Sequence, residues 1–165
     1  MTQGNDVITR RILRASSAVL FAFVLTVTSA AVVKAEDGII KVKSAYSVDE
    51  TIERLKQDIT ARGIEFLPET DPSRLALNAG VMLRPSTLLV FGNPPLGALL
   101  LTSNPSSGLN WPARLLVIEN EQGDVYTASA DYDWIAQRHR IAARREQLAA
   151  ANQLVASIAA SVSAQ

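Results

Sequence analysis

Residues 15–33 carry no charge, and three closely spaced arginines precede them. The segment Val33-Lys34-Ala35 then places small or medium side chains where a signal peptidase reads, and an acidic pair follows at 36–37. A basic flank, an apolar centre and a small-residue exit form the pattern of a secretory signal. The sequence therefore predicts a signal peptide over residues 1–35, so that the part left to fold begins at residue 36.

An uncleaved membrane anchor is the alternative, because residues 15–33 are just long enough to cross a bilayer. Serine and threonine side chains make this run only moderately apolar, which favours cleavage. Positive charges before the run place the domain outside the cytoplasm in either case. We expect an exported protein, periplasmic or secreted, that meets a membrane only if the N-terminal segment is retained.

Composition excludes several kinds of site. The chain has no cysteine, which removes disulfides, thiolate nucleophiles and cysteine-based zinc sites. It carries 16 basic and 16 acidic residues, and without residues 1–35 the balance becomes 12 basic against 15 acidic. A mildly acidic domain is a poor binder of nucleic acid, because phosphate contacts need concentrated lysine and arginine. We expect no nucleic-acid partner.

Two neighbouring patterns predict the first folded elements. Residues 38–46 alternate between apolar and polar side chains, which is typical of a half-buried strand. Ser47 and Glu50 have the spacing of a capping box at a helix N-terminus, and Gly63 supplies a left-handed stop. One face of this helix collects four apolar side chains, Val48, Ile52, Leu55 and Ile59.

The later part of the chain is richer in strands. Strands are expected at 64–67, 86–91, 114–119 and 125–129, and the last two are joined by a turn with Gly123. Helices are expected at 74–79 (capped by Asp71), from Asp133 onward, and at 141–165. Consecutive late strands favour an α+β fold, an antiparallel sheet of about five strands with helices packed on one face. The predicted division is a domain over 36–140 and a C-terminal helix over 141–165.

A short pattern that occurs twice contains the first two candidate ligand-binding residues. Asn93 and Asn104 each precede proline, and a glycine follows four residues after each asparagine. Asparagine can cap a helical turn whose first residue is proline. The alternative is functional, because two helix N-termini with exposed amides can bind a small anion or another polar ligand.

His139 is the only histidine, so a metal site would need carboxylates such as Asp131 and Asp133. One histidine and two aspartates suit a divalent ion, although this spacing is not diagnostic. The alternative is that His139 ends a helix, where a cation complements the backbone dipole. Asp131, Tyr132 and Trp134 either line a pocket at the sheet end or cap and pack a strand-to-helix connection.

An apolar stripe marks the C-terminal helix. Ile141, Leu148, Val155 and Val162 recur every seven residues, and Ala151 and Ile158 fall between them. This spacing resembles that of a coiled coil. The stripe therefore docks on its own domain or pairs with a second copy of the chain, which would make the C-terminal helix a self-association surface.

Four separate segments carry a family resemblance. They are Phe91-Gly92-Asn93-Pro94-Pro95-Leu96-Gly97, Leu109-Asn110-Trp111-Pro112, Arg114-Leu115-Leu116-Val117 and Ile135-Ala136-Gln137-Arg138-His139. In this order they resemble the domain-of-unknown-function 302 family over roughly residues 38–140. The resemblance implies a compact α+β domain, often exported, whose members tend to form dimers, and it brings no established activity.

The chain departs from this family pattern at three polar positions. Relatives commonly have Asp where Asn110 stands, Tyr where Ser129 stands, and His or Gln where Pro72 stands. If those groups form a site in relatives, the resemblance implies a site of different chemistry here.

The leading hypothesis is an exported, non-catalytic domain that binds a small ligand or a protein partner and forms a homodimer. No residue is assigned a catalytic, cofactor-binding or metal-binding role. The candidate ligand-binding residues are Asn93, Asn104, Asn110, Asp131 and His139. The alternative is a metal-dependent or other enzyme that uses Asp131 and His139.

Overall fold

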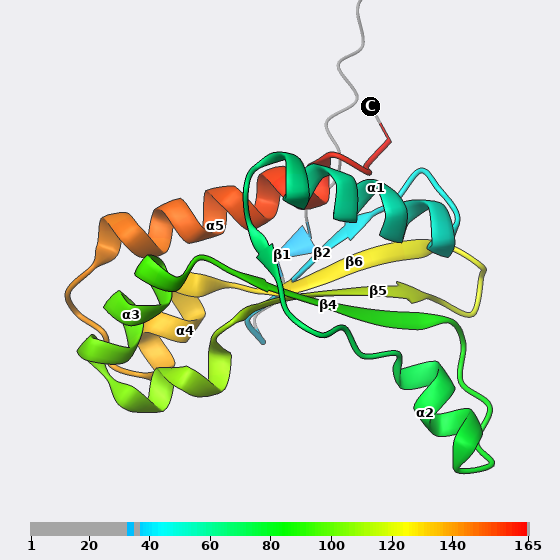
Figure 1. Cartoon of the computed structure of the whole chain (residues 1–165), viewed down its shortest axis with the longest axis horizontal. Coiled ribbons are helices and arrows are strands. Elements are labelled where there is room, and N and C mark those ends of the chain that lie inside the picture. The colour runs from blue at the N-terminus through cyan, green and yellow to red at the C-terminus, as the bar shows by residue number, and fades with distance from the viewer. Residues whose placement is uncertain (1–32, 35–36, 165) are drawn as a thin grey trace, which may run out of the picture.

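The computed structural model describes residues 33–34 and 37–164 (Figure 1). The predicted signal peptide lies outside these residues except at Val33–Lys34. In chain order the elements are β1 (Val33–Lys34), β2 (Ile39–Lys43), α1 (Val48–Ala61), β3 (Glu65–Phe66), α2 (Pro72–Asn78), β4 (Ser86–Gly92), α3 (Pro94–Ser103), the 3-10 helix η1 (Pro105–Asn110), β5 (Ala113–Glu119), β6 (Val125–Ala130), α4 (Tyr132–Arg138) and α5 (Arg145–Ala160).

Within the described residues the strands form one antiparallel sheet in the order β1-β2-β6-β5-β4-β3. The two outermost strands, β1 and β3, have two residues each. This architecture confirms the predicted α+β fold with an antiparallel sheet. None of the described helices is long and apolar enough to cross a membrane.

Helix α1 begins and ends where its sequence predicts. The Ser47 hydroxyl accepts a hydrogen bond from the Glu50 amide at 3.4 Å, and Gly63 adopts a φ of +69° just beyond the helix. The second half of the expected capping box is wrong, because the Glu50 carboxylate accepts two hydrogen bonds from Arg54 instead. The four predicted apolar side chains of α1 are buried in the core.

The β5–β6 hairpin also follows its predicted turn. Gly123 has a φ of +81°, a backbone conformation that glycine adopts without strain. The Asn120 side chain accepts hydrogen bonds from the amides of Gln122 at 3.0 Å and Asp124 at 2.8 Å. Local turn chemistry therefore sets the register in which Leu115 lies opposite Ser129.

The C-terminal helix is shorter than predicted. It begins at Arg145 and not at residue 141, because Arg140 and Arg144 have positive φ values of 53° and 75°. These two residues adopt the left-handed conformation, which is uncommon for residues other than glycine, and they separate α4 from α5. The side chains of the predicted apolar stripe are buried against their own domain. Figure 1 shows α5 lying along the sheet beside α1.

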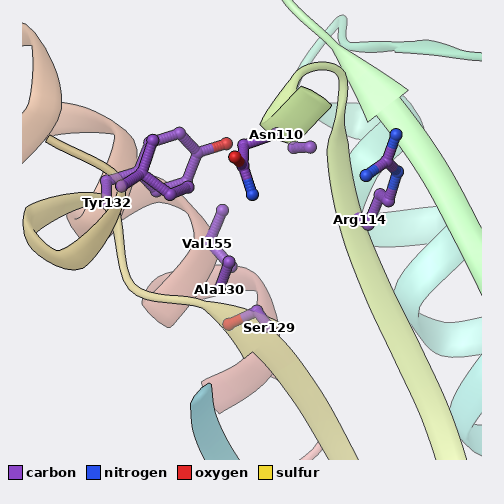
Figure 2. Close-up of a pocket in the computed structure, with 8 residues that line it drawn as sticks. Asn110, Arg114, Ser129, Ala130, Tyr132 and Val155 are labelled. Atoms are coloured by element: carbon purple, nitrogen blue, oxygen red, sulfur yellow. The ribbon is translucent and has the colours of Figure 1, made fainter. Parts of the chain in front are cut away.

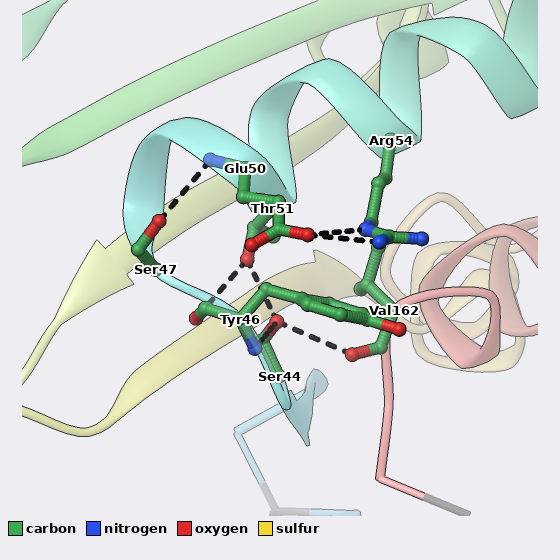
Figure 3. A network of polar contacts seen from close by, with 7 residues as sticks. All are labelled: Ser44, Tyr46, Ser47, Glu50, Thr51, Arg54 and Val162. Atoms are coloured by element: carbon green, nitrogen blue, oxygen red, sulfur yellow. Dashed lines mark hydrogen bonds and ion pairs between the residues drawn. The ribbon is translucent and has the colours of Figure 1, made fainter.

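The last described residues are held against the first long strand (Figure 3). The hydroxyls of Ser44 and Thr51 lie 2.7 Å apart, and Ser44 Oγ donates to the Val162 carbonyl at 3.2 Å. The backbone of Ala45 donates to the same carbonyl at 2.9 Å, and Ser44 forms a β-bridge with Ser163. This network joins β2, α1 and the end of α5.

The two faces of the sheet differ. Helices α1 and α5 cover one face, whereas no described helix lies along the other (Figure 1). Side chains alternate along each strand, so residues flanking the buried Leu89 and Leu115 point to the uncovered side. We call this side the open face; its apolar residues are half-buried and comprise Leu88, Val90, Leu116, Ile118 and Tyr126.

Beside the open face, the segment over residues 66–83, which we call the apolar arm, exposes large apolar side chains. It includes α2, which buries no residue and projects away from α1 and α5 in Figure 1. The exposed apolar residues of the arm are Leu67, Leu75, Leu77, Val81, Met82 and Leu83, whereas Phe66 is partly exposed and packs against Phe91 on the covered side of the sheet. Met82 is 85% exposed, and nothing in the described chain covers it.

Candidate functional site

His139 is buried at the end of α4, and three polar side chains surround it. Its Nε2 donates to Asn110 Oδ1 at 2.7 Å, while its Nδ1 lies 3.0 Å from the Ser106 hydroxyl. The Asn104 amide donates to the His139 carbonyl at 2.7 Å. We call these four residues the His139 network. It brings together three of the five predicted ligand-binding residues.

Asn93 and Asn104 are helix caps, as one of the two sequence interpretations predicts. Asn93 Oδ1 accepts from the Leu96 amide at 3.2 Å at the start of α3. Asn104 Oδ1 accepts from the Ser106 amide at 3.0 Å and from its hydroxyl at 2.9 Å. Each oxygen serves a backbone group that has no partner within the helix, so both residues have a structural role. Asn93 is not part of the His139 network.

Asp131 is a cap as well. Its Oδ1 accepts from the Asp133 amide at 2.9 Å and from the Asn152 side chain at 3.2 Å. Asn152 in turn accepts from the Tyr132 amide at 2.8 Å, which fastens α5 to the start of α4. The buried carboxylate thus holds two helices together.

The same geometry bears on the metal-dependent alternative. In the described part of the chain no three His, Asp or Glu side chains gather as a metal site. Asp131 Oδ1 and both nitrogens of His139 have protein partners. The residues that the alternative would use therefore form no ligand set in this structure.

A small cavity lies beside Asn110, where β5 begins and β6 ends, and residues of α4 and α5 complete its lining (Figure 2). Its volume is about 40 Å³. Its polar lining comes from Asn110, Arg114, Ser129 and Tyr132, and the rest is apolar. Asn110 and Ser129, two positions at which the chain departs from its resemblance to relatives, thus face one cavity.

Tyr132 gives the cavity its distinctive group. Its side chain is only 5% exposed, and its hydroxyl has no hydrogen-bond partner among the described residues. Figure 2 shows this hydroxyl directed toward Asn110. Burial raises the pKa of Tyr132 to about 12, and the positive charge of Arg114 opposes that rise. The phenol is therefore a neutral donor at ordinary pH.

Sequence reasoning singled out Asn110 but not Arg114 as a site residue. Arg114 sits in an apolar strand, and its NH1 donates to the Leu109 carbonyl at 2.9 Å. Ser129 drew attention only as a departure from the family pattern, and Tyr132 only as part of a polar and aromatic cluster. Pairing of Leu115 with Ser129 brings these strand ends together, and no local motif encodes that contact.

A family model described as domain of unknown function DUF302 matches residues 40–161. The chain belongs to the DUF302 family. The match continues beyond residue 140 and through α5, in line with the burial of that helix in the core. Membership supplies the fold and no specific activity.

Curated relatives and a solved structure are similar to this DUF302 chain. Two proteins named fluoride-specific ion channel FluC 1, from Brucella suis biovar 1 and Brucella abortus biovar 1, are each 36% identical over 106 residues. That is 64% of this chain but only 42% and 39% of theirs, so the chain spans about two fifths of these relatives. A crystal structure of an uncharacterized DUF302 protein from Bacillus stearothermophilus has the same fold, with a TM-score of 0.69 at 21% identity, covering 76% of this chain and 98% of that one.

Proposed function

We propose that this DUF302 chain is an exported, non-catalytic binding domain that acts as a homodimer assembled through the open face of its sheet. The observation that carries the proposal is the uncovered apolar surface formed by the open face and the apolar arm. Large exposed apolar patches are uncommon on monomers and mark interaction surfaces. The structural use of the predicted polar residues supports a binding role over a catalytic one.

Charge at the two edges of the open face supports a second copy as the partner. Lys41 on β2 pairs in register with Ala128, which places it on the open face. Glu65 on β3 lies on the same side, because its neighbour Phe66 packs against Phe91 on the opposite side. A two-fold axis along the strands lays the basic edge of one protomer over the acidic edge of its partner, twice per dimer.

The C-terminal helix is the competing surface for self-association. Its apolar stripe is already buried against its own domain, with Leu148 and Ile158 almost fully inaccessible. A dimer built on that stripe would require α5 to leave the core. The open face requires no such rearrangement, which favours it as the interface.

Export of the domain rests on the N-terminal sequence pattern. Two relatives that carry a matching segment are named as ion channels, and the segment is less than half of each. A domain that recurs as part of a longer protein suits a binding module. The channel activity in those names is not proposed for this chain, because most of their length has no counterpart here.

Light scattering on the exported chain tests the dimer. We expect twice the chain mass, and a shift to monomer in Ile118→Lys, which places a charge on the open face. Gln57→Lys is the matched control, since it adds the same charge on the exposed side of α1 and leaves the mass unchanged. A monomer at every concentration in the wild-type chain would refute the proposal.

Charge reversal tests the orientation of the two protomers. Lys41→Glu and Glu65→Lys should each weaken the dimer modestly, and the double variant should recover part of it, because the two facing edges again carry opposite charge although Lys41 and Glu65 are not in direct register. Ala156→Lys, on the exposed side of α5, should have no effect. If Ala156→Lys dissociates the dimer and Ile118→Lys leaves it intact, the interface belongs to the C-terminal helix instead.

Export is tested separately by expressing the full chain in a bacterium and determining the N-terminus of the fraction outside the cytoplasm. We expect the mature chain to begin at Glu36. Recovery of the intact N-terminus in the membrane fraction would support the anchored alternative, and recovery in the cytoplasm alone would contradict export.

A further inference from the structure

The cavity beside Asn110 offers hydrogen-bond donors to whatever occupies it. The Tyr132 side chain is buried, and its hydroxyl borders the cavity without a hydrogen bond to the described protein, so an occupant of the cavity can accept a hydrogen bond from it. Asn110 uses Oδ1 to accept from His139, which leaves its amide group for the cavity. The Ser129 hydroxyl also lies in the lining.

The charge around the cavity has one sign. Arg114 is the charged residue of the lining, and its field reaches the Tyr132 hydroxyl. Its NH1 donates to the Leu109 carbonyl at 2.9 Å, and its side chain extends from β5 on the open-face side, because Arg114 is adjacent to the buried Leu115. Asp131 and Asp133 lie on either side of Tyr132 in the sequence, and neither is part of the lining; Asp131 Oδ1 accepts from the Asp133 amide and from Asn152.

The size of the cavity restricts its ligand. One water molecule needs about 10–15 Å³ of such space, and this cavity has about 40 Å³. It therefore accommodates a ligand of very few atoms and excludes a sugar, a nucleotide or a peptide side chain of any length.

From these donors, this charge and this volume we propose that the cavity binds a small monovalent anion, of the size of a halide or formate. An anion only accepts hydrogen bonds, and the lining offers it three donor groups, on Tyr132, Asn110 and Ser129. Arg114 supplies the positive charge nearest to it. The hydrogen-bond donors of the site are separate from the proposed dimer surface, because Tyr132 packs in the core and Ser129 lies on the covered side of the sheet, whereas Arg114 extends from the open-face side.

The test measures thermal stability and calorimetric binding of the exported chain in sodium chloride, sodium formate or sodium fluoride, against sodium sulfate at equal ionic strength. Sulfate is the control because it is divalent and too large for the cavity. We expect saturable stabilisation by at least one monovalent anion. Sulfate raises stability generally without specific binding, so the absence of saturable calorimetric binding for every monovalent anion would overturn the proposal and leave water as the occupant.

Tyr132→Phe separates this site from general salt effects. It removes one hydrogen bond to a charged ligand, so the affinity should fall about tenfold or more. Without anion the variant should be about as stable as the wild type, because the hydroxyl makes no hydrogen bond to the described protein. Tyr126→Phe, on the open face, is the matched control and should bind as the wild type does.

Arg114→Gln should weaken binding as well, whereas Arg84→Gln, an exposed arginine elsewhere, should not. Wild-type affinity in Tyr132→Phe would overturn the cavity assignment, even if Arg114→Gln lost binding, because the anion would then sit on the surface guanidinium. A wild-type chain that is monomeric and still binds the anion would refute only the proposed self-association.

Discussion

His139 and Asn110 stand 29 residues apart in the chain, yet their side chains meet at 2.7 Å. The bond occupies one imidazole nitrogen, and the Ser106 hydroxyl lies beside the other. The histidine of this chain therefore joins the end of α4 to η1, and it does so from within the protein interior.

Replacing His139 with phenylalanine should destabilise the domain. The change removes both ring hydrogen bonds and leaves the half-buried Asn110 Oδ1 without its donor, at a cost of about 1–3 kcal/mol. Urea unfolding measures this loss. Gln137→Ala, at an exposed position of the same helix, should change stability by less than about 0.5 kcal/mol. Equal stability of H139F and the wild type would argue against the structural role of the network.

Treatment with a chelator should leave the melting temperature unchanged. The metal-dependent alternative needs Asp131 and His139 as ligands, and both already bond to protein groups. Differential scanning calorimetry before and after dialysis against the chelator measures this. A drop in melting temperature that a divalent ion restores, and that Asp131→Asn prevents, would reinstate the metal site.

Alkaline pH should destabilise the domain through Tyr132. Burial raises the pKa of Tyr132 to about 12 from the ordinary phenol value of 10.0. The folded state therefore keeps a proton that the unfolded state releases, so stability is complete below pH 10 and falls as pH rises through about 12. Two pKa units correspond to about 2–3 kcal/mol.

The alkaline effect is measured by urea unfolding at a series of pH values. Tyr132→Phe should lose most of the decline between pH 10 and 12, because phenylalanine has no proton to release. Tyr126→Phe should retain it. An identical decline in Tyr132→Phe and the wild type would show that other groups cause the alkaline loss.

Gly97→Ala should destabilise the domain although alanine favours helices. The Trp111 ring lies against the Gly97 backbone in α3, where an added Cβ would overlap it. Overpacking of this kind costs about 1–3 kcal/mol, whereas helix propensity alone would give a gain of about 1 kcal/mol. The sign of the change in thermal stability therefore decides between contact and propensity.

Ile158→Ala should remove more stability than any change on the outer side of α5. Ile158 is fully buried in the core, and truncating such a residue costs about 2–5 kcal/mol. Gln153→Ala, exposed on the same helix, serves as the control and should change little. A small effect of Ile158→Ala on urea unfolding would mean that α5 contributes little to the folded domain.

The sequence was most informative where structure is set by near neighbours. Ser47 and Gly63 bound α1 correctly, and Gly123 marks the β5–β6 turn, because caps and turns depend on a few adjacent backbone groups. The start of α5 was misplaced because Arg140 and Arg144 adopt left-handed conformations for which arginine gives no signal. Tertiary packing of Ile141 outweighs the helix-forming composition there.

The candidate site was predicted only in part, for a related reason. Asn110 and His139 were named, and their contact depends on where α3 and η1 return to α4. The sequence leaves two roles open for Tyr132, lining a pocket or packing a strand-to-helix connection. Both apply, because its backbone begins α4 and its side chain lines the cavity. The sequence does not predict Arg114 as a site residue, because an arginine within an apolar strand does not reveal which neighbouring strand pairs with it.

Ser163 pairs with Ser44, and the Val162 carbonyl bonds to the neighbouring backbone. The first long strand and the last helix of the domain are thus neighbours, so the polypeptide enters and leaves within about one strand length. Such an arrangement allows a domain to be spliced into a longer chain, or its ends to be rejoined and reopened elsewhere, with little disturbance of the interior. That geometric freedom suits a fold whose relatives include proteins more than twice the length of the shared segment.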